Sequence, residues 1–176
     1  MDLVFPKLYL NNKRINNVAT VKYLGHIFTD KLLDDEDILR QRRYLYMRGN
    51  ILKRKFYLCS IATKVEIFKS YCTQMYTPHL WCCFKNTTMK SLITAYNQTL
   101  RGLLGIPSFC SASQMFAMTN IVSCQALLRN SIFNFMYRIN ETNNVIVYSI
   151  MNSDMRFTSA LQMHWRNVLY TASFGS

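Results

Sequence analysis

The stretch 21–58 constrains the fold most, because it leads from a short apolar strand through an acidic turn into one long helix. At 100° per residue, four apolar side chains of segment 36–58 fall within about 40° of one another: Ile38, Leu45, Leu52 and Phe56. Gly49 lies on the same stripe, where a missing side chain permits close approach of another helix at a propensity cost of about 1 kcal/mol. The segment therefore predicts a helix that is buried along one face against further helices.

The same segment is strongly basic. Residues 40–55 hold seven Lys and Arg and no Asp or Glu. Three of the seven fall roughly opposite the apolar stripe: Arg40, Arg43 and Arg54. The other four lie between the two faces: Arg42, Arg48, Lys53 and Lys55. Because no acid within residues 40–55 stands four residues away to pair with these cations, they predict a surface for a polyanion. The alternative is an ordinary solvated helix face.

The charge of the whole chain points the same way, with 21 Lys and Arg against 9 Asp and Glu and a net charge of +12. Nucleic acid and anionic membrane both fit that sign. No apolar run approaches the roughly 18 to 20 residues of a membrane-spanning helix, and the N-terminus lacks a signal-peptide pattern. We therefore expect an intracellular protein, in the cytoplasm or nucleus rather than secreted, with no membrane partner. The six cysteines agree, because they fall in apolar patterns and form no C-x-x-C pair.

Two groups of residues invite a metal site. Asp34, Asp35, Glu36 and Asp37 directly precede the basic helix. Carboxylates in a first helical turn accept from free N–H groups and favour the positive end of the helix dipole, so we interpret them as capping residues. A site for a hard cation is the alternative. The His79-x-x-Cys82 spacing offers two zinc donors, but no second pair follows at zinc-site spacing, and core cysteines are the prediction.

The N-terminal segment reads as β-structure. Apolar residues at 4–5 and 8–10, an Asn11–Asn12 turn and the run 18–28 predict a β-hairpin or meander, with residues 21–28 as one strand. Two or three strands are not stable alone in water. They must therefore pack on the helices or belong to a sheet completed outside this chain.

Capping signals and apolar periodicity predict further helices downstream. A capping box at Thr63 opens one helix, and another spans 88–104 and ends at Gly105. Ser111 and Ser123 begin two more. The polar segment 140–144 is a predicted loop, residues 145–150 fit either helix or strand, and a last helix covers 159–170.

These elements predict an α+β fold, predominantly α, in which an N-terminal β-hairpin precedes a helical bundle and a C-terminal helical extension. We divide the chain into a hairpin at 1–30, basic helices at 31–80 and a C-terminal helical region at 81–176.

Six short motifs occur in order along nearly the whole chain: Lys22-Tyr23-Leu24-Gly25-His26, Arg40-Gln41-Arg42, Phe68-Lys69-Ser70-Tyr71-Cys72-Thr73, Tyr76-Thr77-Pro78-His79-Leu80-Trp81, Leu103-Leu104-Gly105-Ile106-Pro107 and Ser111-Ala112-Ser113-Gln114-Met115-Phe116. Together they resemble the C-terminal third of the reverse transcriptase, an RNA-directed DNA polymerase, of jockey-like non-LTR (LINE) retrotransposons. The resemblance implies that the hairpin is similar to the primer grip and that the helices after it are similar to the thumb domain.

The resemblance also assigns roles to residues. It implies that four hairpin residues lie near the primer end: Lys22, Tyr23, Leu24 and Gly25. It implies that helix 40–55 follows the template–primer backbone, with four of its cations as candidate contacts: Arg40, Arg43, Arg54 and Lys55. Polymerases of this family hold two metal ions with an aspartate pair in a Tyr-Ala-Asp-Asp-like turn and a third aspartate. This chain has no such turn, since Asp34-Asp35 follows Leu32-Leu33. We expect no catalytic residue, no metal ligand and no polymerisation by the chain alone; Mg²⁺ would belong to the family's palm.

Our first hypothesis is a fragment of that transposable-element polymerase that binds RNA or an RNA–DNA hybrid through phosphates, without base specificity. The second is a decayed or orphan helical protein that acts, if at all, as a protein-interaction module. A third is a polymerase completed in trans by a separate palm.

Overall fold

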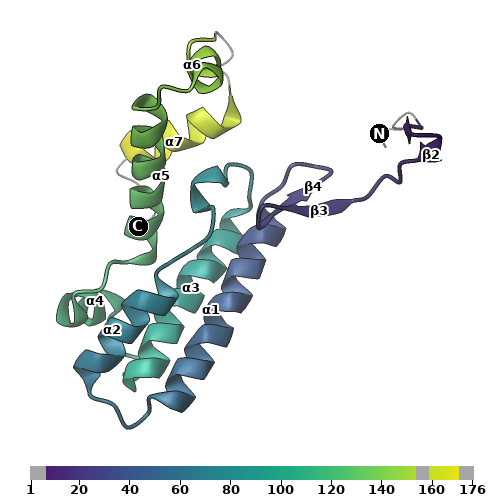
Figure 1. Cartoon of the computed structure of the whole chain (residues 1–176). Helices are drawn as coiled ribbons and strands as arrows, with labels where there is room; N and C mark the ends of the chain where they lie inside the picture. Colours follow the sequence, from purple (N-terminus) through teal and green to yellow (C-terminus); the bar gives the residue numbers. More distant parts are fainter. Residues whose placement is uncertain (1–6, 154–158, 171–176) are drawn as a thin grey trace.

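The computed structural model describes residues 7–153 and 159–170. It is mostly helical with short strands at the N-terminus, which confirms the α+β, predominantly α prediction (Figure 1). The strands are β1 (Tyr9–Leu10), β2 (Lys13–Arg14), β3 (Thr20–Tyr23) and β4 (His26–Thr29). The helices are α1 (Asp35–Lys55), α2 (Ile61–Cys72), the 3₁₀ turn η1 (Pro78–Leu80), α3 (Asn86–Leu104), α4 (Ala112–Thr119), α5 (Cys124–Asn140), α6 (Val145–Met151) and α7 (Ala160–Tyr170).

The strands form two separate antiparallel hairpins. In the first, β1 pairs with β2 around Asn11 and Asn12, whose φ angles of 48° and 59° confirm the predicted left-handed turn. The predicted strand residues Val4 and Phe5 lie outside the described residues. Figure 1 shows this hairpin standing away from the helices.

The prediction of one strand over 21–28 is wrong. β3 and β4 form a hairpin in which Tyr23 pairs with His26, and Leu24 and Gly25 make the turn. Both turn residues have positive φ, 44° and 81°. Successive positive φ values are what a two-residue hairpin turn of the favoured twist requires, and Gly25 adopts one at no steric cost. β4 lies against the start of α1, so this hairpin does pack on a helix.

Helices α1, α2 and α3 form a bundle with one hydrophobic core. The core includes the predicted stripe residues Ile38, Leu45 and Leu52, with Phe56 at its edge. α2 runs back along α1, so α3 lies parallel to α1 (Figure 1). Gly49 is buried at the contact between α1 and α3, where a Cβ atom would overlap the Thr99 methyl group. The prediction that Gly49 permits close helix packing is confirmed.

Several helix ends follow the predicted signals. Gly105 ends α3 with a φ of 71°, and the Ser123 hydroxyl accepts from the Ala126 N–H at the start of α5. The predicted opening of α2 at Thr63 is wrong: Ser60 is the cap, and its hydroxyl accepts from the Thr63 N–H. The serine three residues upstream satisfies that donor, so α2 begins at Ile61.

The C-terminal helices add a smaller core. Ile132 of α5 packs there with Trp165 and Val168 of α7. Residues 145–150, which the sequence left open, form helix α6, capped by the Asn144 carboxamide. The Trp165 indole N–H donates to the His79 carbonyl at 2.7 Å and ties α7 to η1. The larger core contains residues from both sides of position 80 in the sequence, because α3 packs in it with α1 and α2. The division of the helices into regions 31–80 and 81–176 remains a prediction.

No helix within residues 7–153 and 159–170 combines the length and apolarity needed to cross a membrane.

Candidate nucleic-acid interface

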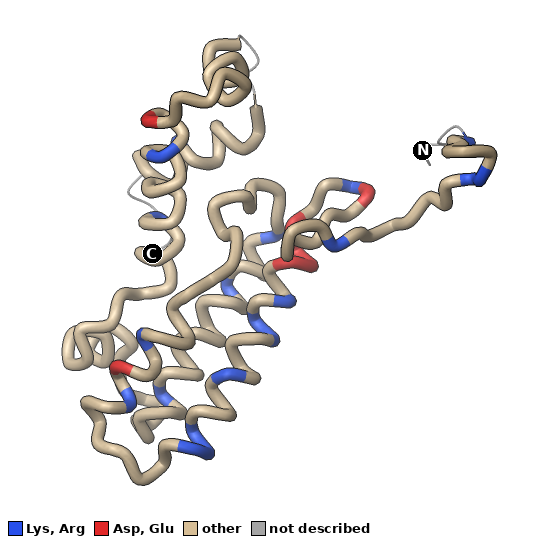
Figure 2. The backbone as a smooth tube through the Cα atoms, in the orientation of Figure 1, with Lys and Arg blue, Asp and Glu red and all other residues tan. Residues whose placement is uncertain are grey.

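Five cations project from α1 without an acidic neighbour. We call them the basic face: Arg42, Arg43, Lys53, Arg54 and Lys55. None has an Asp or Glu oxygen within 4.0 Å in the part of the chain that the structure describes. Arg43 and the three cations at the helix end are exposed, and Arg42 is half-buried. Figure 2 shows Lys and Arg along α1, whereas Asp and Glu gather at its beginning.

The geometry of an α-helix arranges the basic face in rows. Arg42 and Lys53 are eleven residues apart, and so are Arg43 and Arg54. Eleven residues complete three turns to within about 20° and advance about 16 Å along the axis. Within each pair, the two cations therefore project in similar directions, one from the first half of α1 and the other from its last turn. The last-turn cations also stabilise α1 itself, because they lie at the negative end of its dipole.

Arg40 does not belong to this surface, and the prediction that it lies on the exposed side of the helix is wrong. It is 9% exposed, and its Nη2 donates to Asp37 Oδ1 at 2.5 Å. The buried side of α1 is wider than the apolar stripe, because Asp37 and Gln41 are also buried. Asp37, three residues upstream, provides the carboxylate that a buried guanidinium needs.

Arg48 is also used inside the molecule. Its Nη1 donates to the carbonyl oxygens of Tyr71 and Gln74, at 3.1 and 3.3 Å. These carbonyls lie at the end of α2 and just beyond it, so Arg48 joins α1 to that helix end. Of the seven predicted cations, Arg40 and Arg48 are therefore committed to internal contacts, and the basic face keeps five.

The predicted primer-end residues lie on the second hairpin. Tyr23 and Leu24 are 63% and 73% exposed. The Tyr76 hydroxyl donates to the Leu24 carbonyl, and the Tyr76 ring lies where a Cβ on Gly25 would be, so this tyrosine fixes the turn. Lys22 is exposed on β3. The hairpin packs at the start of α1, about 30 Å from the last-turn cations for a helix of this length. The structure thus separates the hairpin from Arg54 and Lys55, whereas Arg40 and Arg43 lie in the half of α1 nearer to it.

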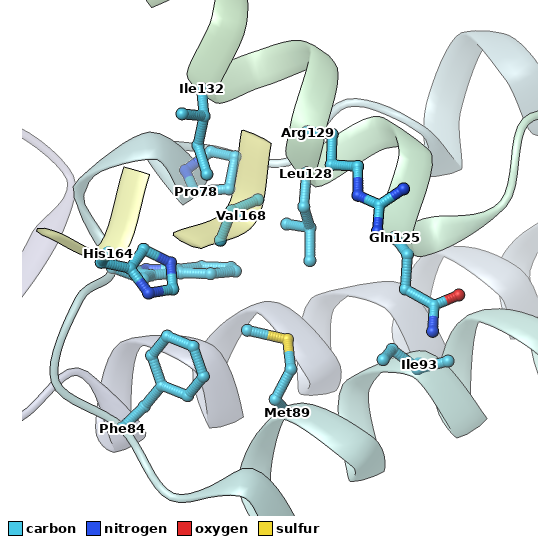
Figure 3. A pocket seen from close by; sticks show the side chains of 11 residues that line it. Pro78, Phe84, Met89, Ile93, Gln125, Leu128, Arg129, Ile132, His164 and Val168 are labelled. Carbon is cyan, nitrogen blue, oxygen red and sulfur yellow. The ribbon is translucent and has the colours of Figure 1, made fainter. Parts of the chain in front are cut away.

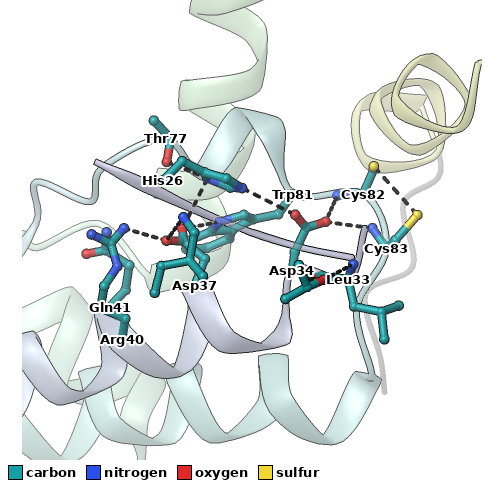
Figure 4. A network of polar contacts seen from close by, with 12 residues as sticks. His26, Leu33, Asp34, Asp37, Arg40, Gln41, Thr77, Trp81, Cys82 and Cys83 are labelled. Carbon is teal, nitrogen blue, oxygen red and sulfur yellow. Dashed lines mark hydrogen bonds and ion pairs between the residues drawn. The ribbon is translucent and has the colours of Figure 1, made fainter. Parts of the chain in front are cut away.

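Two acidic residues at the start of α1, Asp34 and Asp37, make a set of buried polar contacts that we call the clasp (Figure 4). Asp34 Oδ2 accepts from the backbone N–H groups of Cys82 and Cys83, at 2.8 and 2.9 Å. Asp37 Oδ2 accepts from the Trp81 indole at 2.9 Å, and Asp37 Oδ1 accepts from the Ile27 N–H at 3.1 Å. These two carboxylates join the β-hairpin, the start of α1 and the loop that precedes α3.

The clasp corrects part of the capping interpretation: Asp35, Glu36 and Asp37 do lie in the first turn of α1, at the positive end of its dipole, but the predicted capping hydrogen bond is not made. Asp34 occupies the N-cap position but makes no side-chain hydrogen bond to the first turn of α1. Asp35 Oδ1 likewise accepts from the Lys85 N–H across the bundle, at 3.1 Å. Sequence reasoning missed these contacts because the donors are backbone groups some fifty residues away. The Asp37–Arg40 spacing of three was the one local signal.

His26 lies within the clasp and is 4% exposed. Its Nε2 is 3.5 Å from Asp34 Oδ1, and its Nδ1 is 3.3 Å from Asp37 Oδ2 and 3.1 Å from the Thr77 hydroxyl. The imidazole therefore links both carboxylates of the clasp to the turn before η1. Among the described residues, no group of three or more His, Cys, Asp or Glu has an arrangement that could hold a metal ion.

The His79-x-x-Cys82 pair does not converge on a common point. The His79 ring stacks on Phe135 with a centroid distance of 4.1 Å, and its Nδ1 lies 3.3 Å from the Ser131 hydroxyl. Burial, with a contribution from Arg138, lowers the pKa of His79. His79 is thus a packing residue at the contact between η1 and α5.

A small cavity lies where α3, α5 and α7 meet (Figure 3). Its lining is mostly apolar and includes Trp81, Phe84, Met89, Leu128 and Ile132, with Arg129 and His164 at its edges. Its volume is about 30 Å³. That is room for one or two water molecules and too small for an organic ligand. The cavity is a packing gap between the bundle and the C-terminal helices.

Comparisons of the chain with models of protein families, with curated proteins and with solved structures found no match.

Proposed function

We propose that this chain binds RNA or an RNA–DNA hybrid through the basic face of α1, by contacts to phosphates and without base specificity. The observation that carries the proposal is a row of cations left without acidic partners in the described structure. The surrounding bundle strengthens it, because residues 38–110 contain twelve Lys and Arg and one acid, Glu66. Such an excess creates a positive potential that attracts a polyanion.

The shape of the surface supports phosphate contacts rather than base recognition. The basic face lies on the outer surface of a single helix, and none of its five cations lines the cavity shown in Figure 3. Three tyrosines lie among or next to these cations in the sequence: Tyr44, Tyr46 and Tyr57. Tyr44 lies beneath the Arg40 guanidinium, and the Tyr46 hydroxyl donates to Gln98 at 2.7 Å. Tyr57 is 66% exposed and is the aromatic best placed to stack on a base.

The proposal extends to the origin of the chain. The six collinear motifs support an origin in a non-LTR retrotransposon reverse transcriptase. The chain would be the region of that enzyme that holds the template–primer backbone and does not polymerise by itself. In that proposal, Lys22, Tyr23, Leu24 and Gly25 approach the primer end while α1 follows the duplex. The protein then works in the cytoplasm or nucleus. Its six unpaired cysteines agree with a reducing compartment.

A salt titration with charge-matched variants tests the interface. The test variant replaces Lys53, Arg54 and Arg43 by Gln. The control removes the same charge elsewhere by replacing Lys13, Arg14 and Arg166, which are all exposed and distant from α1 in sequence. Binding to an RNA–DNA hybrid is measured by fluorescence anisotropy at several salt concentrations. Each phosphate contact contributes about 0.9 to the slope of log K against log salt on a duplex.

We expect the test variant to lose affinity and up to about 2.7 of that slope, because three contacts are removed. The control variant keeps most of both. Equal losses in the two variants would mean that binding follows net charge and not this surface. Absence of binding by the unmodified chain at low salt would remove the proposal altogether.

The exposed apolar hairpins favour one second candidate, a protein-interaction module. Leu8, Tyr9 and Leu10 of the first hairpin are 59%, 63% and 65% exposed, and Tyr23 and Leu24 of the second are more than half exposed. Clustered apolar exposure of this kind is typical of surfaces that another protein covers. Size-exclusion chromatography with light scattering separates the candidates, since a monomer that binds hybrid supports the first and a self-associating chain that does not bind supports the second.

A further inference from the structure

Two adjacent thiols lie directly behind the clasp. Cys82 and Cys83 follow η1 and precede α3, and their sulfur atoms are 3.7 Å apart. Both residues are half-buried, whereas Cys72 and Cys124 are buried in the core. Cys59 and Cys110 are half-buried but have no neighbouring cysteine in the sequence. The chain therefore contains one pair of consecutive cysteines, in a position that a small reagent can reach.

The backbone of this pair makes hydrogen bonds to Asp34 that form part of the clasp. The N–H groups of Cys82 and Cys83 both donate to the same oxygen, Asp34 Oδ2, at 2.8 and 2.9 Å. The Asp34 N–H donates in return to the Cys83 carbonyl at 2.8 Å. The Cys83 N–H belongs to the peptide between the two cysteines, and the Cys82 N–H and the Cys83 carbonyl belong to the peptides on either side of it, so these three hydrogen bonds depend on the local backbone of the pair (Figure 4). Through Asp34 they are next to His26 and the second hairpin.

We propose that Cys82 and Cys83 are a redox-sensitive vicinal dithiol, which low-molecular-weight disulfides such as glutathione disulfide convert reversibly to an intrachain disulfide that opens the Asp34 clasp. One cysteine thiolate attacks glutathione disulfide, whose S–S bond breaks and releases one glutathione. The second cysteine thiolate attacks the resulting mixed disulfide and releases the other glutathione. Two electrons pass from the dithiol to glutathione disulfide, and the two thiol protons end on the released glutathione molecules.

Covalent geometry explains why the clasp opens. A disulfide needs its sulfur atoms about 2.0 Å apart and usually joins Cα atoms about 4.4 to 6.8 Å apart. Consecutive Cα atoms are about 3.8 Å apart, so ring closure must rotate the intervening peptide. Two N–H groups that converge on one oxygen cannot both keep their hydrogen bonds through that rotation. The resulting ring is strained, and strained disulfides are readily reduced, which makes the step reversible.

The two thiols have different roles in this step. Burial, the hydrogen bond to Cys83 and the Asp34 carboxylate raise the pKa of Cys82 to about 12. A thiol with so little thiolate at neutral pH is a poor first nucleophile. Cys83 therefore attacks first, and Cys82 closes the ring because the mixed disulfide is beside it.

Mass spectrometry and hydrogen exchange test the proposal on the whole reduced chain. After incubation with glutathione disulfide, we expect the peptide that contains residues 82–84 to lose two hydrogen atoms and to carry no glutathione. Amide exchange at Asp34, Cys83 and Ile27 becomes about tenfold faster, because each of these N–H groups bonds within the clasp. Exchange at Leu92, inside α3, stays unchanged.

Single substitutions separate the steps. Cys82→Ser stops at a mixed disulfide on Cys83 and keeps slow exchange at Ile27, and Cys83→Ser reacts more slowly than either the unmodified chain or Cys82→Ser. Cys110→Ser is the matched control and behaves like the unmodified chain. A mixed disulfide that persists on unmodified Cys83, or ring closure that leaves exchange at Ile27 unchanged, overturns the proposal. Both results come from the unmodified protein, so they do not depend on the folding of a variant or on nucleic-acid binding.

Discussion

The two ends of α1 use the same kinds of charge in opposite ways. At its beginning, Asp37 and Arg40 are buried against one another, and Asp37 also accepts from the Trp81 indole and the Ile27 N–H. At its end, Lys53 and Arg54 are exposed and have no acidic partner among the described residues. The charged groups at the first end make hydrogen bonds and an ion pair that hold the fold together. The second end leaves its charge available to a ligand.

The difference follows from the cost of burying a charge. A guanidinium or carboxylate removed from water needs several hydrogen bonds or a counter-ion, so the buried end of α1 needs a partner for each charge. An exposed cation keeps its hydration and needs no partner inside the protein. The density of charge along a sequence therefore does not by itself identify a binding surface. The burial of each charged side chain must also be known, because it separates charges paired inside the protein from charges available to a ligand.

The strongest test removes the carboxylate that joins three elements at the buried end. Asp37→Ala leaves the Arg40 guanidinium and two N–H donors without their acceptor, and we expect a loss of about 3 to 5 kcal/mol in the free energy of unfolding. Urea denaturation followed by circular dichroism measures it. Asp35→Ala is the control, because Asp35 makes one exposed hydrogen bond and its loss costs about 1 kcal/mol or less. Similar losses for both variants would contradict the clasp.

A pair of arginine substitutions compares the two ends directly. Arg40→Met removes one buried charge-assisted hydrogen bond and costs about 2 kcal/mol of stability, with little effect on nucleic-acid affinity. Arg54→Met changes stability by less than about 0.5 kcal/mol, because the side chain is exposed, and lowers affinity instead. Urea denaturation and anisotropy are measured on both variants. If Arg40→Met weakened binding as much as Arg54→Met, the division of α1 into a structural and a binding end would be wrong.

Much of the bundle was predictable from local patterns. The stripe of Ile38, Leu45 and Leu52, the close contact at Gly49 and the end of α3 at Gly105 all depend on residues within a few turns of one another. Such patterns state directly which face a helix buries and where its backbone turns. They made the predominantly helical fold accessible from the sequence.

The errors arose where contacts with residues far along the chain contribute to a residue's role. Arg40 looked exposed by periodicity, but it is buried beside Asp37, whose carboxylate also accepts from the distant Trp81 indole. Asp34 looked like a helix cap, but its acceptors are filled by N–H groups of Cys82 and Cys83. A single sequence holds no signal for pairs some fifty residues apart. The nucleic-acid role of the basic face stays a prediction for the same reason, since its partner is another molecule.

A substitution midway along α1 tests whether the two ends are held on one rigid rod. In Gly49→Ala the new methyl group overlaps Thr99 Cγ2, so α1 and α3 must separate. We expect a net loss of about 1 kcal/mol, since overpacking costs about 1 to 3 kcal/mol and the gain in helix propensity offsets about 1 kcal/mol. The same change in a Thr99→Ser background removes the overlapping methyl and should be neutral or stabilising. Equal losses in both backgrounds would contradict the close contact between the helices.

Acid provides the mildest and most selective test of the difference between the ends. The three histidines of the chain lie near the buried end: His26 in the clasp, His79 in η1 and His164 beside Phe84. Burial lowers the pKa of His79 and, against an opposing effect of Asp34, that of His164 below the ordinary 6.5.

A lowered pKa means that the folded protein disfavours the protonated form. The stability that these two histidines provide is therefore complete above pH 6.5 and falls as the pH drops below that value, where the unfolded chain binds protons that the folded chain does not. Between pH 7.5 and 5.5 we expect the urea midpoint to fall and His79→Phe to reduce that fall. The basic face contains no histidine, and Lys and Arg keep their charge throughout this range. Affinity for hybrid at fixed salt should then stay constant while stability declines. A parallel increase in affinity would show that a protonated histidine contributes to the binding surface. The separation of α1 into a structural end and a binding end would then be wrong.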